Sequence, residues 1–117
     1  MLVTKIFSFD SAHNLTDYDG KCEHLHGHTY KLEVTVEGKI KHNGLVIDFV
    51  LLKKIVKEHV LDKLDHTYLN DTIENPSAER IAMWIWDQLK NCGFDGEVRL
   101  HEIVLWETPT SKVVFNG

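Results

Sequence analysis

Two histidines separated by one residue open the strand-like segment over residues 26–37. Apolar and polar residues alternate through this segment, so its side chains point alternately to the two faces of a sheet. His26 and His28 share one face with the apolar residues that follow: Tyr30, Leu32, Val34 and Val36. Two imidazoles on one strand face can converge on a single ion, and neutral imidazole suits Zn, Cu, Fe or Ni. The spacing therefore predicts a metal site, with zinc as the ion of choice where there is no redox chemistry.

A third histidine ends the strand that is predicted over residues 3–12. His13 shares its strand face with Phe7, Phe9 and Ser11, as the other two histidines share theirs with apolar residues. Three histidines from two neighbouring strands form a catalytic type of zinc site, whose fourth position is left for water or substrate. The alternative is three ordinary histidines that are satisfied by hydrogen bonds. All three histidines are predicted to point inward from their strands, and a cysteine lies close to two of them in the sequence. Both features favour the metal site.

Cys22 lies four residues before His26 and has two possible roles. As a fourth zinc ligand it would close the site and make it structural. As an unliganded thiol beside the ion it would ionise easily, because the positive charge of the metal favours the thiolate. A thiolate in that position could accept a proton from a bound substrate.

Asp65, His66 and Glu107 are further candidates, each with a structural alternative. Asp65 could orient His66 as the acid or base of a proton transfer. Taken alone, the pair is better explained as the end of a helix, where the dipole favours histidine. Glu107 ends a strand whose preceding residues are apolar: Ile103, Val104, Leu105 and Trp106. Its carboxylate is either solvated at the strand end or an acceptor for paired N–H donors of a ligand.

The hydrophobic periodicity predicts two strands, two helices and two strands in that order. We expect the strands over residues 3–12, 26–36, 98–107 and 112–115. One helix begins at Asp48 as N-cap and ends near residue 64, and the second begins at Pro76 with Asn75 or Ser77 as its cap. Hairpin-linked strands and segregated helices give an α+β fold, with an antiparallel sheet and the helices on one face. Self-association would cover the other face and remove the sheet edges, so we expect a homo-oligomer.

The composition excludes several classes of protein. The 117 residues are enough for one domain with its own core, residues 1–117. A formal net charge of −5 argues against nucleic acid as a partner, because binding to phosphates needs a cationic surface. No apolar run is long enough to cross a membrane, and no signal peptide precedes the first strand. These features predict a cytoplasmic protein.

Five motifs together resemble the 6-pyruvoyl-tetrahydropterin synthase family, and they cover essentially the whole chain. In order they are His13 after Phe7-x-Phe9, Cys22-x3-His26-Gly27-His28, Leu64-Asp65-His66, Asn75-Pro76-Ser77-Ala78-Glu79 and Trp106-Glu107-Thr108. The three-residue gap after the cysteine is similar to that of the 6-carboxy-5,6,7,8-tetrahydropterin synthase branch, which acts in queuosine and 7-deazapurine biosynthesis.

The resemblance implies a tunnelling fold (T-fold). In this fold a four-stranded antiparallel sheet with two helices, in the order ββααββ, assembles into a barrel-shaped hexamer or tetramer with sites between subunits. The implied roles are zinc ligands His13, His26 and His28; proton-transfer residues Cys22, Asp65 and His66; a pterin anchor, Glu107; and pocket residues Ser77 and Glu79. By the same resemblance, Asp65 and His66 could enter the site from a neighbouring subunit.

The implied reaction is that of a lyase. It would convert 7,8-dihydroneopterin triphosphate to 6-carboxy-5,6,7,8-tetrahydropterin, acetaldehyde and triphosphate. Two alternatives lie within the family. One is a pyruvoyl synthase, against which the short cysteine gap argues. The other is a dihydroneopterin-cleaving enzyme, from a branch whose resemblance to the family includes glutamate at the position of Cys22. Glu23 beside the cysteine keeps the second alternative open. From another class, a non-catalytic zinc-stabilised module would have four protein ligands and would unfold on chelation.

Overall fold

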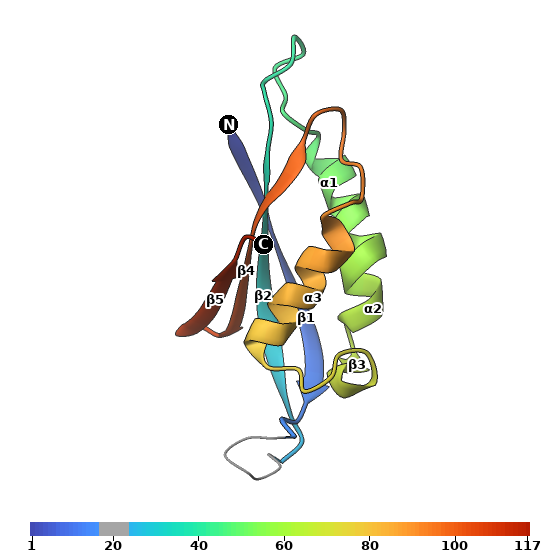
Figure 1. Ribbon diagram of the computed structural model, residues 1–117, viewed down its shortest axis with the longest axis vertical. Coiled ribbons are helices and arrows are strands. Elements are labelled where there is room, and N and C mark those ends of the chain that lie inside the picture. The colour runs from blue at the N-terminus through green and yellow to red at the C-terminus, as the bar shows by residue number, and fades with distance from the viewer. Residues whose placement is uncertain (17–23) are drawn as a thin grey trace.

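The helices of the protein lie on one face of a five-stranded sheet (Figure 1). The computed structural model describes residues 1–16 and 24–117. Its elements are, in chain order, β1 (Leu2–His13), β2 (His26–Glu37), α1 (Phe49–Val56), the π-helical turn η1 (Lys57–Leu61), α2 (Asp62–Leu64), β3 (Thr67–Tyr68), the 3-10 turn η2 (Leu69–Asp71), α3 (Ala78–Leu89), β4 (Arg99–Thr108) and β5 (Ser111–Phe115). The strands are hydrogen-bonded in the order β3-β1-β2-β4-β5. The expected α+β class and the order of the main elements are confirmed.

The sheet has one strand more than the sequence predicts. β3 is only two residues long and pairs in parallel with β1, with Thr67 opposite Ser11 and Tyr68 opposite Ala12. The expectation of four strands, all antiparallel, is wrong in this respect, because a two-residue strand has no periodicity to reveal it. The four expected strands are present and pair antiparallel.

β1 and β2 pair along their whole length in one register. This register places His13 opposite His26 and Ser11 opposite His28. The predicted inner face is buried under the helices, with His13 at 1% and Tyr30 at 0% exposure. The alternation inferred from the sequence is therefore confirmed, and it carries all three histidines to one end of the helix-covered face.

The two long helices begin at side-chain caps. A carboxylate oxygen of Asp48 accepts the N–H of Val50 at 2.8 Å, and the hydroxyl of Ser77 accepts the N–H of Arg80 at 3.2 Å. These contacts satisfy donors that a helix start leaves unpaired. Of the two caps considered for the second helix Ser77 is the one formed, and Pro76 precedes the helix instead of opening it. The first helix is interrupted, because η1 separates α1 from α2.

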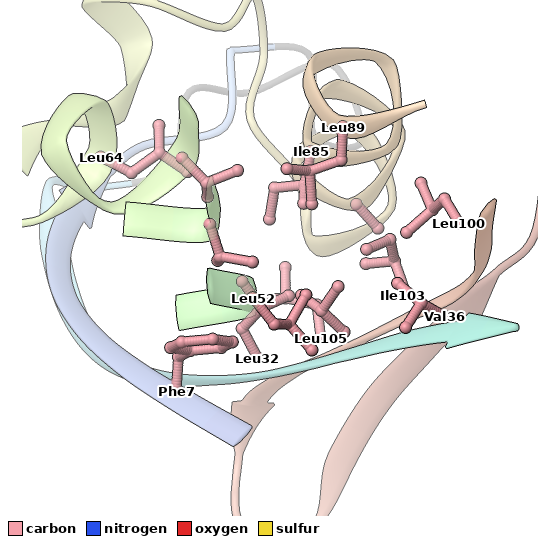
Figure 2. Close-up of a cluster of buried hydrophobic side chains, with 14 of the residues drawn as sticks. Phe7, Leu32, Val36, Leu52, Leu64, Ile85, Leu89, Leu100, Ile103 and Leu105 are labelled. Atoms are coloured by element: carbon pink, nitrogen blue, oxygen red, sulfur yellow. The ribbon is translucent and has the colours of Figure 1, made fainter. Parts of the chain in front are cut away.

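The hydrophobic core lies between the helices and the inner face of the sheet (Figure 2). The helices contribute Leu52, Leu64, Ile85 and Leu89, and the strands contribute Phe7, Leu32, Val36, Leu100, Ile103 and Leu105. Burial of one such side chain stabilises the fold by roughly 1.5–3 kcal/mol. This layer fixes the sheet on which the histidines are mounted.

In the part of the chain that the structure describes, no helix covers the other face of the sheet (Figure 1). On this outer face Leu2 is 51%, Ile6 58% and Val114 52% exposed. Apolar side chains in such positions lose contact with water only if another surface covers them. Within the described residues, no helix combines the length and apolar character needed to cross a membrane.

Candidate functional site

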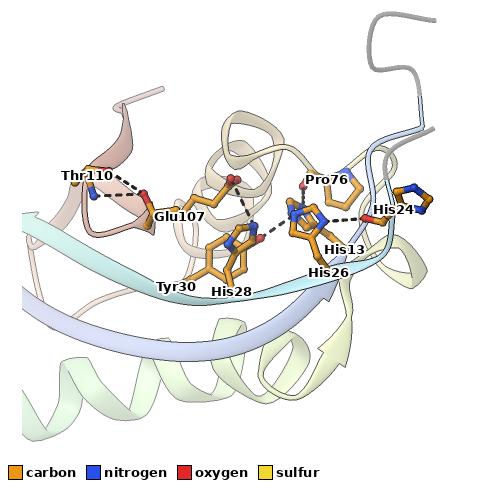
Figure 3. Close-up of polar contacts among 9 residues, drawn as sticks. His13, His24, His26, His28, Tyr30, Pro76, Glu107 and Thr110 are labelled. Atoms are coloured by element: carbon orange, nitrogen blue, oxygen red, sulfur yellow. Dashed lines mark hydrogen bonds and ion pairs between the residues drawn. The ribbon is translucent and has the colours of Figure 1, made fainter. Parts of the chain in front are cut away.

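Three histidines meet where β1 ends and β2 begins (Figure 3). The Nε2 atoms of His13 and His26 are 3.1 Å apart. One ring nitrogen from each of His13, His26 and His28 lies within 4.8 Å of the others. His13 is buried and the other two are half-buried. The structure thus brings together the three residues that were predicted as metal ligands.

Main-chain carbonyls set the tautomers of two of these rings. His13 Nδ1 lies 2.7 Å from the carbonyl oxygen of Pro76, and His26 Nδ1 lies 2.8 Å from that of His24. Because a carbonyl only accepts, both Nδ1 atoms carry the proton and both Nε2 atoms carry a lone pair. Metal-binding histidines are oriented in this way by their second nitrogen.

The facing lone pairs fit a cation. Two such nitrogens repel each other at 3.1 Å unless a positive charge lies between them. Tetrahedral Zn–N bonds of about 2.0–2.1 Å would hold two nitrogens roughly 3.3 Å apart, close to the observed distance. The geometry and the tautomers of this site are those of a centre that could hold a divalent metal.

Glu107 extends the site along the same face of the sheet. One of its carboxylate oxygens is 3.6 Å from Nε2 of His28, and its side chain is 30% exposed (Figure 3). Tyr30 is fully buried beside the histidines, with its hydroxyl 3.5 Å from His13 Nδ1. Burial, and secondly the negative charge of Glu107, raise the pKa of Tyr30, so the phenol stays protonated. Tyr30 is therefore an uncharged side chain that packs beside the histidines.

A small groove of about 280 Å³ opens beside Glu107. It runs between the start of α3 and the β4–β5 turn, and its lining residues are Ala78, Glu79, Glu107, Ser111, Lys112 and Val113. Glu79 and Glu107 thus share one groove. The predicted pocket residue Ser77 is not in the lining, and its hydroxyl is engaged as the cap of α3.

The Asp65–His66 pair lies elsewhere, at the edge of the outer face. Asp65 Oδ1 is 3.0 Å from His66 Nδ1, and the same oxygen accepts the N–H of Asp10 at 3.0 Å. That main-chain N–H is the largest of the causes that lower the pKa of Asp65, so the carboxylate is ionised at neutral pH. His66 is 77% exposed and has a left-handed backbone, with φ of 58°. It borders an open hollow of about 630 Å³ whose lining also includes Thr29 and His28.

Within one chain, the histidine cluster and the Asp65–His66 pair form two separate groups. The alternative explanation, that Asp65 and His66 only end a helix, accounts for the main-chain contact and not for the side chains. The N–H of Asp65 bonds to the carbonyl of Leu61 at 2.9 Å, whereas its carboxylate is turned to β1. Cys22, which the sequence places close to His26, lies outside the described residues.

Sequence reasoning missed three contributors to these groups. The carbonyls of His24 and Pro76 orient the rings of the candidate metal ligands, and Asp10 holds the Asp65–His66 pair. No residue type signals a main-chain carbonyl, so the first two could not be found. Asp10 could have been noticed in the sequence. It is an acidic residue three positions before His13, and the alternation places it on the outer face of β1.

Comparison with known proteins places the chain in a family. The model of the family described as 6-pyruvoyl tetrahydropterin synthase matches residues 2–117. A 6-carboxy-5,6,7,8-tetrahydropterin synthase of Haemophilus influenzae is 42% identical, over 93% of this chain and 94% of the relative. A dihydroneopterin monophosphate aldolase of Pyrococcus furiosus is 46% identical, over 86% of this chain and 83% of the relative. The 6-pyruvoyl tetrahydropterin synthase of Caenorhabditis elegans superposes with a TM-score of 0.85 at 25% identity, over 100% of this chain and 95% of that one. The chain therefore belongs to the 6-pyruvoyl tetrahydropterin synthase family.

Proposed function

We propose that the protein is a zinc-dependent 6-carboxy-5,6,7,8-tetrahydropterin synthase. It would act in the cytoplasm on 7,8-dihydroneopterin triphosphate and one water molecule, and release 6-carboxytetrahydropterin, acetaldehyde and triphosphate, in queuosine or 7-deazapurine biosynthesis. The observation that carries this proposal is the three-histidine cluster, which has a carboxylate 3.6 Å from one of its rings. Relatives of this name cover nine-tenths or more of the chain at 40–42% identity.

His13, His26 and His28 would hold the zinc ion through one nitrogen each. Three neutral ligands leave the full positive charge of the ion in the site and one position vacant. When bound, the ion supplies Lewis acidity toward the side-chain hydroxyls of the substrate. The carbonyls of Pro76 and His24 keep the ligand nitrogens unprotonated and correctly aimed.

The remaining residues would bind the pterin and move protons. The carboxylate of Glu107 accepts paired N–H donors of the pterin ring, which only an ionised acid at a partly enclosed position does well. Glu79 lines the same groove. Cys22, as a thiolate, accepts the proton that leaves the substrate side chain. His66, whose Nδ1 is engaged by Asp65, exchanges protons at Nε2.

The proposed assignment includes a homo-oligomer, as a hexamer or tetramer. The Asp65–His66 pair and the histidine cluster are separate groups in one chain, although the hollow beside His66 also reaches His28. Because the side chain of His66 is 77% exposed, the pair can be presented to another subunit, and we infer that a neighbouring subunit supplies it to the site. The exposed apolar residues of the outer face, Leu2 and Ile6 among them, favour such an assembly.

Replacement of His26 tests the metal centre. We expect His26→Ala to lower the bound zinc from one ion per chain to a small fraction, because two imidazoles bind zinc far more weakly than three. Elemental analysis of dialysed protein measures the loss. His59→Ala is the matched control, since this histidine lies on η1 away from the cluster. Zinc content that is unchanged in His26→Ala would contradict the assigned ligand set.

Product analysis tests the reaction. The relative from Pyrococcus furiosus is named an aldolase at 46% identity, so an aldolase is the second candidate function. Mass spectrometry after incubation with 7,8-dihydroneopterin triphosphate, and separately with the monophosphate, distinguishes the outcomes. We expect a 6-carboxy product with acetaldehyde from the triphosphate. A 6-hydroxymethyl product would establish the aldolase, and a 6-pyruvoyl product the pyruvoyl synthase.

A zinc-stabilised module without catalytic activity is the remaining candidate. It would yield none of these products and would unfold when zinc is chelated. We expect the proposed enzyme to keep its fold under chelation, because an extensive hydrophobic core joins the sheet to the helices. A thermal melt with and without chelator separates the two.

A further inference from the structure

Asp10 makes three contacts around the Asp65–His66 pair. Its N–H donates to Asp65 Oδ1 at 3.0 Å, and its carbonyl accepts the N–H of His66 at 2.6 Å. One of its carboxylate oxygens lies within 4.8 Å of an Asp65 oxygen and of a His66 ring nitrogen. No other described residue bonds to both members of the pair.

The side chain of Asp10 is itself anchored to the neighbouring strand. Its Oδ1 accepts the hydroxyl of Thr29 at 2.5 Å, and Thr29 is its partner in the β1–β2 register. Both main-chain groups of Asp10 point away from β2, toward the pair. The two residues therefore form a position of the antiparallel ladder that has no main-chain bond between the strands. Their side-chain hydrogen bond is the polar tie between the strands at this position.

We propose that Asp10 is a positioning residue for the proton-transfer pair, through its hydrogen bond to Thr29. The bond fixes the end of β1, and β1 in turn fixes the carboxylate of Asp65 and the backbone of His66. The ring of His66 then keeps its proton on Nδ1, against Asp65, and presents Nε2 to the hollow. This inference rests on the proposed function in so far as His66 acts on a substrate. The geometry that it assigns to the pair can be tested without catalysis.

The experiment compares variants that keep or remove the anchor. Asp10→Asn retains an oxygen that accepts from Thr29, whereas Asp10→Ala and Thr29→Val break the bond. We expect Asp10→Ala and Thr29→Val to lower kcat about tenfold or more with KM within about twofold, since misplacement of a proton-transfer group by 1 Å can cost about 10²-fold. Asp10→Asn should stay within about threefold of the parent. Asp71→Asn removes an exposed negative charge on η2, leaves the residues of the pair unchanged and should behave as the parent.

Nitrogen NMR of the His66 ring, at a pH where the ring is neutral, provides a readout that needs no activity. We expect the Nδ1–H tautomer to predominate in the parent and in Asp10→Asn, and its share to fall at least about twofold in Asp10→Ala, since a ring freed from its acceptor returns to the Nε2–H form. If the parent protein turns over no pterin, the proposed function fails while the NMR comparison still decides the role of Asp10. Parent-like kcat and tautomer in Asp10→Ala would overturn the inference. Equal impairment in Asp10→Asn would also overturn it, because charge and not the anchor would then matter.

Discussion

Oligomers that contain both His28→Ala and His66→Ala subunits are expected to regain activity that neither variant has alone. Under the proposed function, a complete site contains the metal ligands of one subunit and the Asp65–His66 pair of another. In a random equal mixture, each of these two requirements is met with probability one half, so about one quarter of the parent activity should return if the pair acts across a heterologous interface. Co-expression of differently tagged chains, followed by tandem affinity purification and a turnover assay, measures this.

The single variants and a third combination serve as controls. Under the proposed function, His28→Ala alone lacks a metal ligand and His66→Ala alone lacks the proton-transfer ring. The kcat of each should therefore fall by at least about 10²-fold, as loss of a general acid or base does. Oligomers of His28→Ala with the double variant His28→Ala, His66→Ala contain no intact metal cluster and should stay inactive. If the mixed oligomers of the two single variants are equally inactive, each chain supplies its whole site and the proposed subunit sharing is wrong.

The histidine cluster was predictable because it depends on local alternation alone. Side chains two residues apart in a strand share a face, and both flanking strands carry apolar residues on that face. A hairpin register is the only further requirement, and β1 and β2 pair without interruption. The short-range pattern of the sequence was therefore enough to place His13, His26 and His28 together.

The position of Glu107 was harder to predict for a physical reason. The register of β4 shifts against β2 at Thr35 and Val36, and against β5 between Trp106 and Thr108. A bulge changes which face the following residues point to. Alternation along β4 therefore could not decide between a solvated and an enclosed carboxylate. The contact between Glu107 and His28 is known only from the folded structure.

The Asp65–His66 pair depends on contacts that no periodicity encodes. Its place is set by a two-residue strand and by bonds from β1, more than fifty residues earlier in the chain. The hydroxyls of Ser11 and Thr67 both bond to the carbonyl of Leu64, and this ties the end of α2 to the sheet. Such long-range polar contacts arise from packing, so the sequence could name the pair but not the face on which it lies.

Cys22→Ala is expected to abolish turnover while leaving the zinc content near that of the parent protein. The structure gives three histidines whose ring nitrogens lie within 4.8 Å of one another, so we expect the metal to bind without a fourth protein ligand. A thiolate near such a site would accept a proton, and its loss should lower kcat by about 10²–10⁴-fold. Turnover assays on dialysed protein, paired with elemental analysis of the same sample, measure both quantities.

Two further variants make the result specific. Cys22→Ser keeps the size of the side chain but not its acidity, so it should be nearly as inactive as Cys22→Ala if the group is a base. Cys92→Ala removes the other cysteine, a half-buried thiol that bonds to the carbonyl of Gln88 at 2.9 Å, and should retain activity. Loss of zinc in Cys22→Ala would instead make the thiol a fourth ligand. A closed centre of that kind has no position for a substrate, and the proposed lyase mechanism would then have to be abandoned even though the fold and the family assignment stand.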